Sequence, residues 1–208
     1  MIHDIPSIAP APNPLPAMVR ARHRPRVQWL PRWLLTALLT LANLAALAPP
    51  ARAQFVEYDV KAAFLASFAQ FVKWPPAAFS DPAAPFSIGI LGDDPFGGSL
   101  EKIVKGQTVA GRKIVIRRGR RPEDVRSCQV VFIAKSERRR LAELIAGLQG
   151  ASILIVGESE QFTRQGGAIG FTMEADKVRF EINSGSAQRA GLELSSRLMK
   201  LGRGAAPP

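Results

Sequence analysis

The chain has 208 residues, a formal net charge of +11 and a single cysteine, Cys128, and its two histidines, His3 and His23, lie near the N-terminus. Beyond residue 23 there is no imidazole for a Ser–His or Cys–His pair or for general base catalysis near neutral pH, and the usual zinc sites cannot be assembled. The composition therefore argues against the common hydrolases and zinc enzymes. We expect a protein without catalytic activity, cofactor or metal.

The N-terminal segment has the three-part order of a secretory signal. Arginines are concentrated over 20–32, an apolar run follows over 34–48, and the sequence then reads Pro49-Pro50-Ala51-Arg52-Ala53. The apolar run is about fifteen residues long, shorter than the roughly 20 that span a membrane, so a cleaved signal is favoured over a membrane anchor. We predict cleavage between Ala53 and Gln54.

Cleavage at this point divides the chain into an N-terminal extension with its signal peptide, 1–53, and an exported domain, 54–208. The first part holds six of the 28 basic and one of the 17 acidic residues, which leaves the exported domain with a net charge of +6. An exported protein does not normally meet nucleic acid, and we expect none as a partner. The arginines over 117–126 and 138–140 favour a solvated surface, or contact with an acidic partner or an anionic membrane surface.

Helices alternate with short apolar strands along the first two thirds of the exported domain. The predicted elements, in chain order, are a helix over 60–72, a strand over 86–91, a helix over 96–105, a strand over 114–117, one helical turn after Pro122, a strand over 129–134, a helix over 137–148 and a strand over 153–156. Apolar residues three and four positions apart predict the helices, and uninterrupted apolar runs are typical of strands buried on both faces. Asp94 and Ser136 stand where helix N-caps are expected.

The last third begins with a different pattern. Apolar and polar residues alternate over 169–173 and over 178–182, which predicts two strands joined at Ala175-Asp176 as an antiparallel hairpin. A closing helix is expected over 186–201. The whole pattern predicts an α/β fold: a single-domain three-layer α/β sandwich with a mostly parallel sheet, an antiparallel edge hairpin and an ordered core over 57–202.

Residues near strand ends are the candidates for contact with a ligand or partner. Asp93 and Asp94 follow a predicted buried strand, the position at which open α/β sheets bind ligands, although Asp94 is equally explained as a helix cap. Arg179 and Glu181 share the exposed face of one strand and could serve recognition. The complete set of candidate contact residues is Asp93, Asp94, Phe96, Ser136, Arg179 and Glu181.

Cys128 directly precedes the apolar run over 130–133. Two interpretations stay open for it: a small buried residue at the entrance of a strand, or a thiol that is reactive or forms an intermolecular disulfide. A disulfide within the chain is excluded because a single cysteine has no second thiol to join.

Several of these segments, taken in order, resemble the YfiR family of small periplasmic proteins. The resemblance covers nearly all of the exported domain. The residues that carry it are Lys61-Ala62-Ala63-Phe64-Leu65, Phe68, Phe71, Trp74-Pro75, Gly92-Asp93-Asp94-Pro95-Phe96-Gly97, Gly111-Arg112, Cys128, Ser136, Gly166-Gly167, Arg179-Phe180-Glu181-Ile182-Asn183, Arg189-Ala190-Gly191-Leu192 and Ser195-Ser196. Some members carry cysteine pairs, which this chain lacks.

The resemblance implies a periplasmic regulator without chemistry of its own. It would repress an inner-membrane diguanylate cyclase by contact with the cyclase's periplasmic portion, lowering cyclic di-GMP. A sequestering outer-membrane lipoprotein and a homodimer are implied as further partners. Two alternatives stay open: a periplasmic solute-sensing module acting on another membrane signalling or transport protein, with a pocket near Asp93, Asp94 and Ser136, and an enzyme using carboxylates such as Asp94, Glu158 and Glu181.

Overall fold

The computed structural model describes residues 51–204, with side chains from residue 56 onward. The predicted signal peptide and the alternative membrane anchor over 34–48 lie outside these residues, except that Ala53 and Gln54 belong to the first turn of helix α2, Ala51–Phe71. This helix extends the one predicted over 60–72 toward the N-terminus. No helix within the described range is long and apolar enough to cross a membrane.

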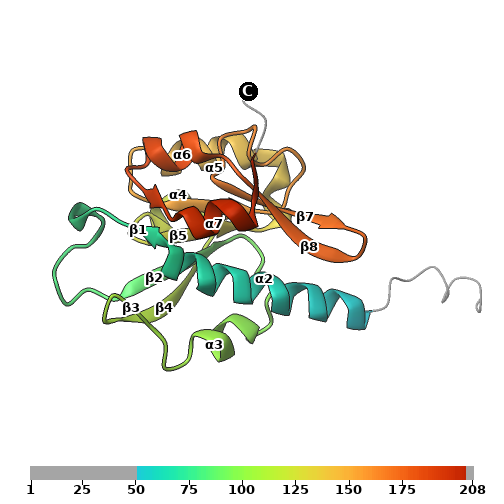
Figure 1. Ribbon diagram of the computed structural model, residues 1–208, viewed down its shortest axis with the longest axis horizontal. Coiled ribbons are helices and arrows are strands. Elements are labelled where there is room, and N and C mark those ends of the chain that lie inside the picture. The colour runs from blue at the N-terminus through green and yellow to red at the C-terminus, as the bar shows by residue number, and fades with distance from the viewer. Residues whose placement is uncertain (1–50, 205–208) are drawn as a thin grey trace, which may run out of the picture. The chain divides into compact units, whose positions relative to one another are not determined.

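Eight strands of the described part form one curled sheet in the order β10-β8-β7-β6-β5-β2-β4-β3 (Figure 1). Their bounds are β2 Phe86–Leu91, β3 Thr108–Val109, β4 Arg112–Gly119, β5 Val130–Ile133, β6 Leu154–Gly157, β7 Ile169–Glu174, β8 Lys177–Ile182 and β10 Arg203–Gly204. Neighbours from β4 through β7 are parallel, whereas β7 with β8 and β3 with β4 are antiparallel. The predicted mostly parallel sheet with an antiparallel hairpin is confirmed. The short strand β10 pairs with β8, so the hairpin lies one strand inside the edge.

The hairpin of β7 and β8 has the predicted turn. Phe171 lies opposite Phe180, and Glu174 opposite Lys177. Ala175 and Asp176 between them both have positive φ, 47° and 59°. Two left-handed residues are what a tight two-residue hairpin loop of type I′ requires, and here they occur without the glycine that usually supplies them.

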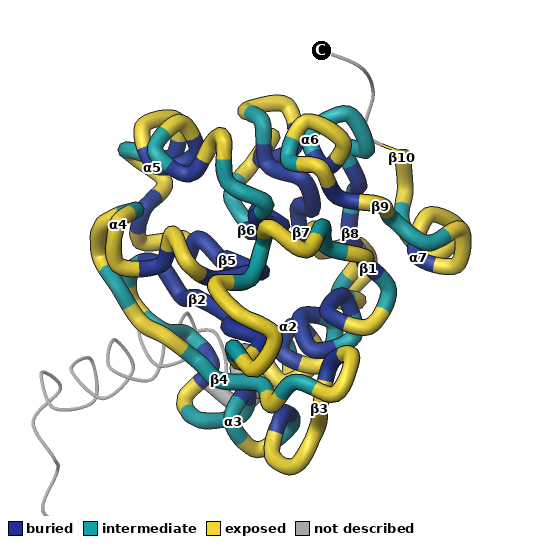
Figure 2. The backbone as a smooth tube through the Cα atoms, turned by 90° about the vertical axis from the view of Figure 1, so that its left-hand side faces the viewer, coloured by how far each residue is buried: buried dark blue, intermediate teal, exposed yellow. Residues whose placement is uncertain are grey.

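Helices cover both faces of the sheet and complete the three layers (Figures 1 and 2). Helices α2, α3 (Ser99–Val104), α6 (Ser184–Arg189) and α7 (Ser196–Leu201) contribute to the apolar cluster on one face, and α4 (Pro122–Val125) and α5 (Leu141–Leu148) to the cluster on the other. In the central strand β5, Val130 and Phe132 belong to the first cluster, Val131 and Ile133 to the second. Successive side chains of a strand point to opposite faces, so an uninterrupted apolar run is buried on both.

The predicted closing helix over 186–201 is wrong. The structure instead has two short helices, α6 and α7, separated by strand β9 (Glu193–Leu194), which pairs antiparallel with β1 (Val72–Lys73) after α2. Gly191, with a φ of 72°, takes the left-handed conformation that commonly follows a helix end. Ser195 begins the second helix, since its hydroxyl accepts the N–H of Leu198 at 3.2 Å. The apolar spacing therefore combined residues of two helices.

The helix predicted over 96–105 begins later, at Ser99 of α3. Gly97 and Gly98 both have positive φ, 55° and 90°, which is incompatible with a right-handed helix at these positions. Asp94 is consequently not a helix cap. Its carboxylate accepts the N–H of Phe96 at 2.8 Å within the turn that follows β2.

The helix predicted over 137–148 starts as a 3₁₀ helix, η2 (Lys135–Arg140), and becomes α5 only at Leu141. Ser136 does not cap it: its hydroxyl accepts the backbone N–H of Asp93 at 3.0 Å. Another short 3₁₀ helix, η1 (Pro76–Ala78), begins at the second of the two prolines, Pro75 and Pro76, that come after α2 and β1.

Cys128 is buried beside Gly89 of β2, and burial raises the pKa of its thiol to about 11, an effect that the positive charge of Arg117 partly offsets. We expect iodoacetamide at pH 8 to alkylate this thiol at least about a hundredfold more slowly in the native chain than in urea, because the thiolate is the reactive species. Mass spectrometry measures both rates. As a control, the new thiol of a Ser80→Cys variant should be alkylated rapidly in the native chain, because residue 80 is exposed. Equal alkylation rates of Cys128 in the native chain and in urea would contradict its burial.

Candidate functional site

The carboxyl ends of the parallel strands gather several candidate residues at one edge of the sheet. Strand β2 is flanked by β4 on one side and β5 on the other. The chain therefore reverses its direction along the sheet at this point, which is where open α/β sheets bind ligands. Asp93 follows β2, Ser136 follows β5, and Glu158 follows the next strand, β6.

Asp93 and Ser136 are in direct contact at this edge. The backbone N–H of Asp93 donates to the Ser136 hydroxyl at 3.0 Å, and the Asp93 carboxylate accepts from Arg120 at 2.8 Å. Gly92 has a φ of 98°, and a Cβ there would lie 2.6 Å from the side chain of Glu137. Glycine is thus required for the loop after β2 to approach η2 so closely.

Asp94 belongs to a neighbouring network of ion pairs. Its carboxylate accepts from Nε of Arg118 at 2.8 Å, and Arg118 also pairs with Glu101 of α3. The hydrogen bond from Arg118 lowers the pKa of the Glu101 carboxyl, and burial only partly opposes this effect. These contacts hold the loop after β2 against β4 and α3, although Oε2 of Glu101 is buried and has no hydrogen-bond partner among the residues that the structure describes.

Phe96 lies in the core behind this loop. Its ring packs edge-on against Phe132 of β5, with 5.0 Å between ring centroids, and against Tyr58 of α2, with 5.9 Å. Only 2% of the residue is exposed. Phe96 thus anchors the loop after β2 to the apolar cluster beneath α2, and its ring does not reach the surface where a partner would bind.

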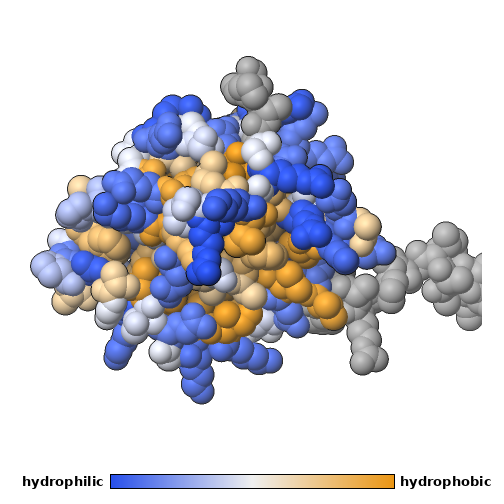
Figure 3. All heavy atoms as spheres, viewed as in Figure 1, coloured by the Kyte–Doolittle hydropathy of each residue, from blue (hydrophilic) through white to orange (hydrophobic). Residues whose placement is uncertain are grey.

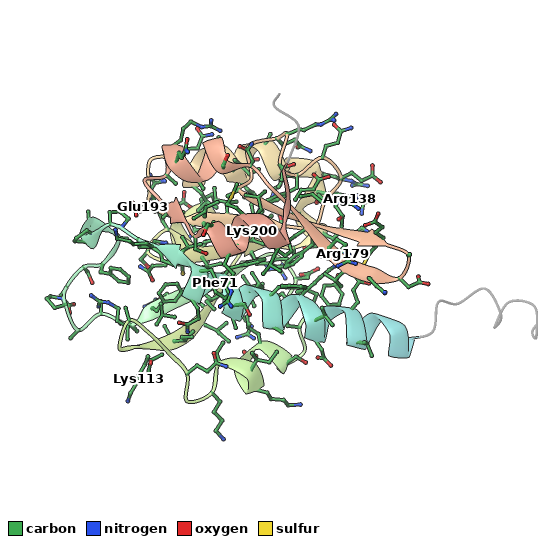
Figure 4. All side chains as sticks on the ribbon, viewed as in Figure 1. Phe71, Lys113, Arg138, Arg179, Glu193 and Lys200 are labelled. Carbon is green, nitrogen blue, oxygen red and sulfur yellow. The ribbon has the colours of Figure 1, made fainter. Side chains whose placement is uncertain are left out.

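The remaining candidates, Arg179 and Glu181, line a separate groove. A groove of about 1410 Å³ lies between α2, the loop after β6 and the β7–β8 hairpin; we call it the hairpin groove. Figure 4 places Arg179 on the hairpin, next to α2. Glu181 is held at the inner end, where it accepts the hydroxyl of Thr163 at 3.2 Å. The structure therefore divides the six candidates between two places.

A buried lysine stands in the wall of the hairpin groove. The side chain of Lys61 on α2 is 4% exposed and forms ion pairs with Glu57, one turn earlier, and with Glu158 at the end of β6, which is also 4% exposed. Tyr58 donates its hydroxyl to Glu158 at 3.1 Å, and the Lys61 ammonium lies 4.6 Å from the centre of the Tyr58 ring. These contacts tie α2 to the end of β6.

The Tyr58 hydroxyl in this wall is poorly suited to act as a general base at neutral pH. Burial raises the pKa of the Tyr58 hydroxyl above its ordinary value, and the charge of Glu158 and the hydrogen bond to it add to the effect. Tyr58 therefore stays protonated and serves as a hydrogen-bond donor to Glu158 in the wall of the groove. The neighbouring Ser159 hydroxyl is buried and has no hydrogen-bond partner within the described residues.

Apolar side chains are exposed along the rim of the hairpin groove. Val56 and Val60 on α2 and Met173 on β7 are exposed, and Figure 3 shows apolar surface along this side of α2. Soluble proteins rarely leave such side chains grouped beside a groove unless the surface takes part in an interaction. The rim thus provides the apolar contacts and the wall the charged groups of a candidate docking surface.

Sequence reasoning missed Tyr58, Lys61 and Met173 as residues of this groove. A signal existed for Lys61, which lies on the apolar face of α2 one turn before Leu65, where a charged residue must find a partner. For Met173 the alternation of apolar and polar residues predicted burial, because it placed this residue on the same face of the strand as the buried Ile169 and Phe171. The outer part of β7 is exposed because the hairpin projects beyond the neighbouring strands (Figure 1).

Two solved structures are similar to the chain at 12% sequence identity. One is a conserved domain protein from Vibrio cholerae O1 biovar El Tor strain N16961, matched over 58% of this chain and 54% of that chain with a TM-score of 0.43. The other is the ABC domain from Streptococcus pneumonia in complex with L-Trp, matched over 58% and 55% with a TM-score of 0.43. The chain thus spans about half the length of each. No curated protein matches it.

The comparison with protein families gives a much more extensive match. The model of the YfiR/HmsC-like family matches residues 58–203, which include both ends of the sheet and all six candidate contact residues. The motifs from Lys61 to Ser196 that suggested the resemblance all fall within this range. The resemblance is confirmed, and the chain belongs to the YfiR/HmsC-like family.

Proposed function

We propose that this protein is a periplasmic regulator that represses an inner-membrane diguanylate cyclase by binding the cyclase's periplasmic portion. Membership of the YfiR/HmsC-like family, over residues 58–203, is the observation that carries the proposal, because it suggests a periplasmic regulator of cyclic di-GMP signalling. The signal sequence predicted over 1–53 supports export. A regulator of this kind needs no chemistry: it shifts its target toward the inactive state by binding that state more tightly.

We place the contact with the cyclase at the hairpin groove. Its exposed apolar rim suits the anchoring side chains that dominate protein interfaces, and the ion pairs of Lys61 keep its wall in place. An outer-membrane lipoprotein that sequesters the regulator would compete for the same surface. A homodimer is the third partner in this proposal, and cross-linking in the periplasm would separate the three.

The absence of catalysis is part of this proposal. The carboxylates of the alternative enzyme hypothesis each contact a different group: Asp94 pairs with Arg118, Glu158 with Lys61, and Glu181 with Thr163. Glu158 and Glu181 both line the hairpin groove, but each is held by a different partner and Asp94 lies outside that groove. We therefore assign the three no common site for acid–base chemistry, which normally requires such groups to converge on one reacting atom.

The charged variant Met173→Glu tests the groove. We expect it to weaken binding to the cyclase by about thirtyfold or more, because a carboxylate in a desolvated anchor position costs about 2 kcal/mol or more. A deletion strain complemented with this variant should therefore keep cyclic di-GMP near the level of the deletion. Mass spectrometry of cell extracts gives that level.

The matched control is Met199→Glu on α7. Met199 is 38% exposed against 48% for Met173, but it does not line the hairpin groove, so this variant should repress like the unchanged chain. If the Met173→Glu variant still represses, the contact with the cyclase lies outside the hairpin groove, and the proposed function is not contradicted. If deletion of the whole gene left cyclic di-GMP unchanged while a cyclase was expressed, the proposed target would be wrong.

A solute-sensing module is the second candidate, and the buried, unpartnered hydroxyl of Ser159 in the hairpin groove is the observation that favours it. A solute that binds only the folded chain stabilises it by about 2.7 kcal/mol at a hundredfold excess over Kd. A thermal-shift screen of small periplasmic solutes, repeated with Ser159→Ala, would distinguish this function from a purely protein-binding one.

A further inference from the structure

Strand β4 has one side that the other described strands cover only at its first two residues. On its inner side, residues 114–119 pair one by one with residues 86–91 of β2. On its outer side, β3 pairs only with Arg112 and Lys113. Residues 114–119 therefore form an open sheet edge about 20 Å long, with backbone N–H and C=O groups directed outward at alternate positions. We call these six residues the β4 edge.

A shallow groove runs beside the β4 edge. It has a volume of about 720 Å³, and its apolar lining consists of Ile114 and Ile116 of β4 and Val104 of α3. Figure 2 shows β4 as partly exposed next to the fully buried β2. A strand added at this edge would place every second side chain over Ile114 and Ile116, the face that continues into the core.

The charge around the β4 edge is positive. Lys105, Lys113 and Arg117 are exposed, and none of them takes part in the ion pairs found within residues 51–204. Figure 4 shows Lys113 pointing away from the rest of the protein. Lys113 and Arg117 lie on the face of β4 opposite Ile114 and Ile116, because side chains alternate along a strand. An added strand would therefore meet Ile114 and Ile116 on one face, beside the Arg118–Glu101 ion pair, and the cations Lys113 and Arg117 on the other.

A second copy of the chain is a poor occupant of this edge. In an antiparallel, two-fold arrangement centred on Val115, Lys113 would lie opposite Arg117 of the second copy. Like charges directly opposite one another destabilise a strand pair, and basic residues on edge strands are a common means of preventing self-association. The same charges attract an acidic strand.

We propose that the β4 edge binds an extended, acidic segment of a partner protein as an added strand. The backbone of the segment pairs with residues 114–119, its apolar side chains enter the groove over Ile114 and Ile116, and its carboxylates face Lys113 and Arg117. This surface is separate from the hairpin groove, and its use does not depend on the proposed repression of a cyclase.

The test uses the protein purified from the host and a six-residue peptide of alternating valine and glutamate. At saturation, the peptide should slow amide hydrogen exchange within residues 114–119 by about tenfold or more, because the outward N–H groups become hydrogen-bonded. A peptide with the same sequence but N-methylated at alternate residues should give no such protection. The Met173→Glu variant should bind the acidic peptide normally.

The double variant Lys113→Glu/Arg117→Glu supplies the second measurement. Both side chains are exposed, so the chain should fold, while its affinity for the acidic peptide should fall about tenfold or more and its affinity for a valine–lysine peptide should rise. Equal affinity of the variant for the acidic peptide, or protection located outside residues 114–119, would overturn the proposal. So would protection of this edge without peptide that rises with protein concentration, which would identify a second copy as the occupant.

Discussion

Replacing Lys61 by methionine is expected to lower the free energy of unfolding by about 3–5 kcal/mol. The change keeps an unbranched side chain only one atom shorter, but it removes the only ammonium group that pairs with the buried carboxylate of Glu158 among the described ion pairs. The Glu158 carboxylate, which is 4% exposed, would then have lost its solvation and its opposite charge and would keep only the hydrogen bond from Tyr58. Urea unfolding followed by circular dichroism measures the loss.

The chain contains a matched control for this experiment. Lys73 pairs with Glu193 at 3.0 Å between β1 and β9, but the two side chains are 77% and 73% exposed. We expect Lys73→Met to cost about 0–1 kcal/mol, because water already solvates both charges. If Lys61→Met cost no more than this control, Glu158 would have to be reached by solvent.

A second substitution should restore much of the stability that Lys61→Met removes. In the double variant Lys61→Met/Glu158→Gln, no unpaired charge is left at the end of β6, and Glu57 can turn toward solvent from its more exposed position. The two changes are therefore expected to be strongly non-additive, which is typical of partners in one ion pair. Simple additivity would mean that the two residues stabilise the fold independently.

Phe162→Ala is expected to reduce the free energy of unfolding by a comparable amount, about 3–5 kcal/mol. The ring is 2% exposed and lies in the second apolar cluster, in the loop between β6 and β7. A methyl group added at Gly157 or at Gly167 would overlap the ring, so both glycines are part of its cavity. Removing the ring leaves a space that two glycine backbones cannot fill.

A substitution of Gly157, which contacts the Phe162 ring, provides a second test of this packing. Gly157→Ala alone should cost about 1–3 kcal/mol or more through overlap with Phe162. In Gly157→Ala/Phe162→Ala the overlap is gone, so the double variant should be more stable than the sum of the single effects predicts, by about 0.5–3 kcal/mol. Gly204→Ala, where a Cβ meets nothing, should stay within about 0.5 kcal/mol of the unchanged chain.

Phe162 also connects stability with the candidate site. It lines the hairpin groove a few residues after Glu158 and Ser159, so its ring supports the loop that forms one wall. We therefore expect the stability changes at Phe162 and Lys61 to be accompanied by weaker binding at the groove. The Met173→Glu variant differs from both because it alters an exposed side chain and leaves the core intact.

The fold class and the six longer strands, β2 and β4 to β8, could be predicted from the sequence, whereas the two-residue strands β1, β3, β9 and β10 could not. Side chains of the apolar run 130–133 are buried on both faces of the sheet. The alternation of apolar and polar residues over 178–182 predicted a strand with one face in the core and the other toward solvent. The family resemblance also followed from local motifs in their order along the chain. These features depend on residues a few positions apart, which is the range over which hydrophobic periodicity carries information.

The contacts at the hairpin groove and at the β4 edge arise only in the folded domain. Lys61 meets Glu158, 97 residues away, because α2 crosses the carboxyl end of β6, and the edge of β4 is open because β3 is only two residues long. The tertiary structure also decided that 186–201 forms two helices, since Gly191 turns the chain and β9 pairs with β1. No local pattern encodes the order of strands in a sheet or the partner of a buried charge, because both depend on segments that meet only when the whole domain has folded.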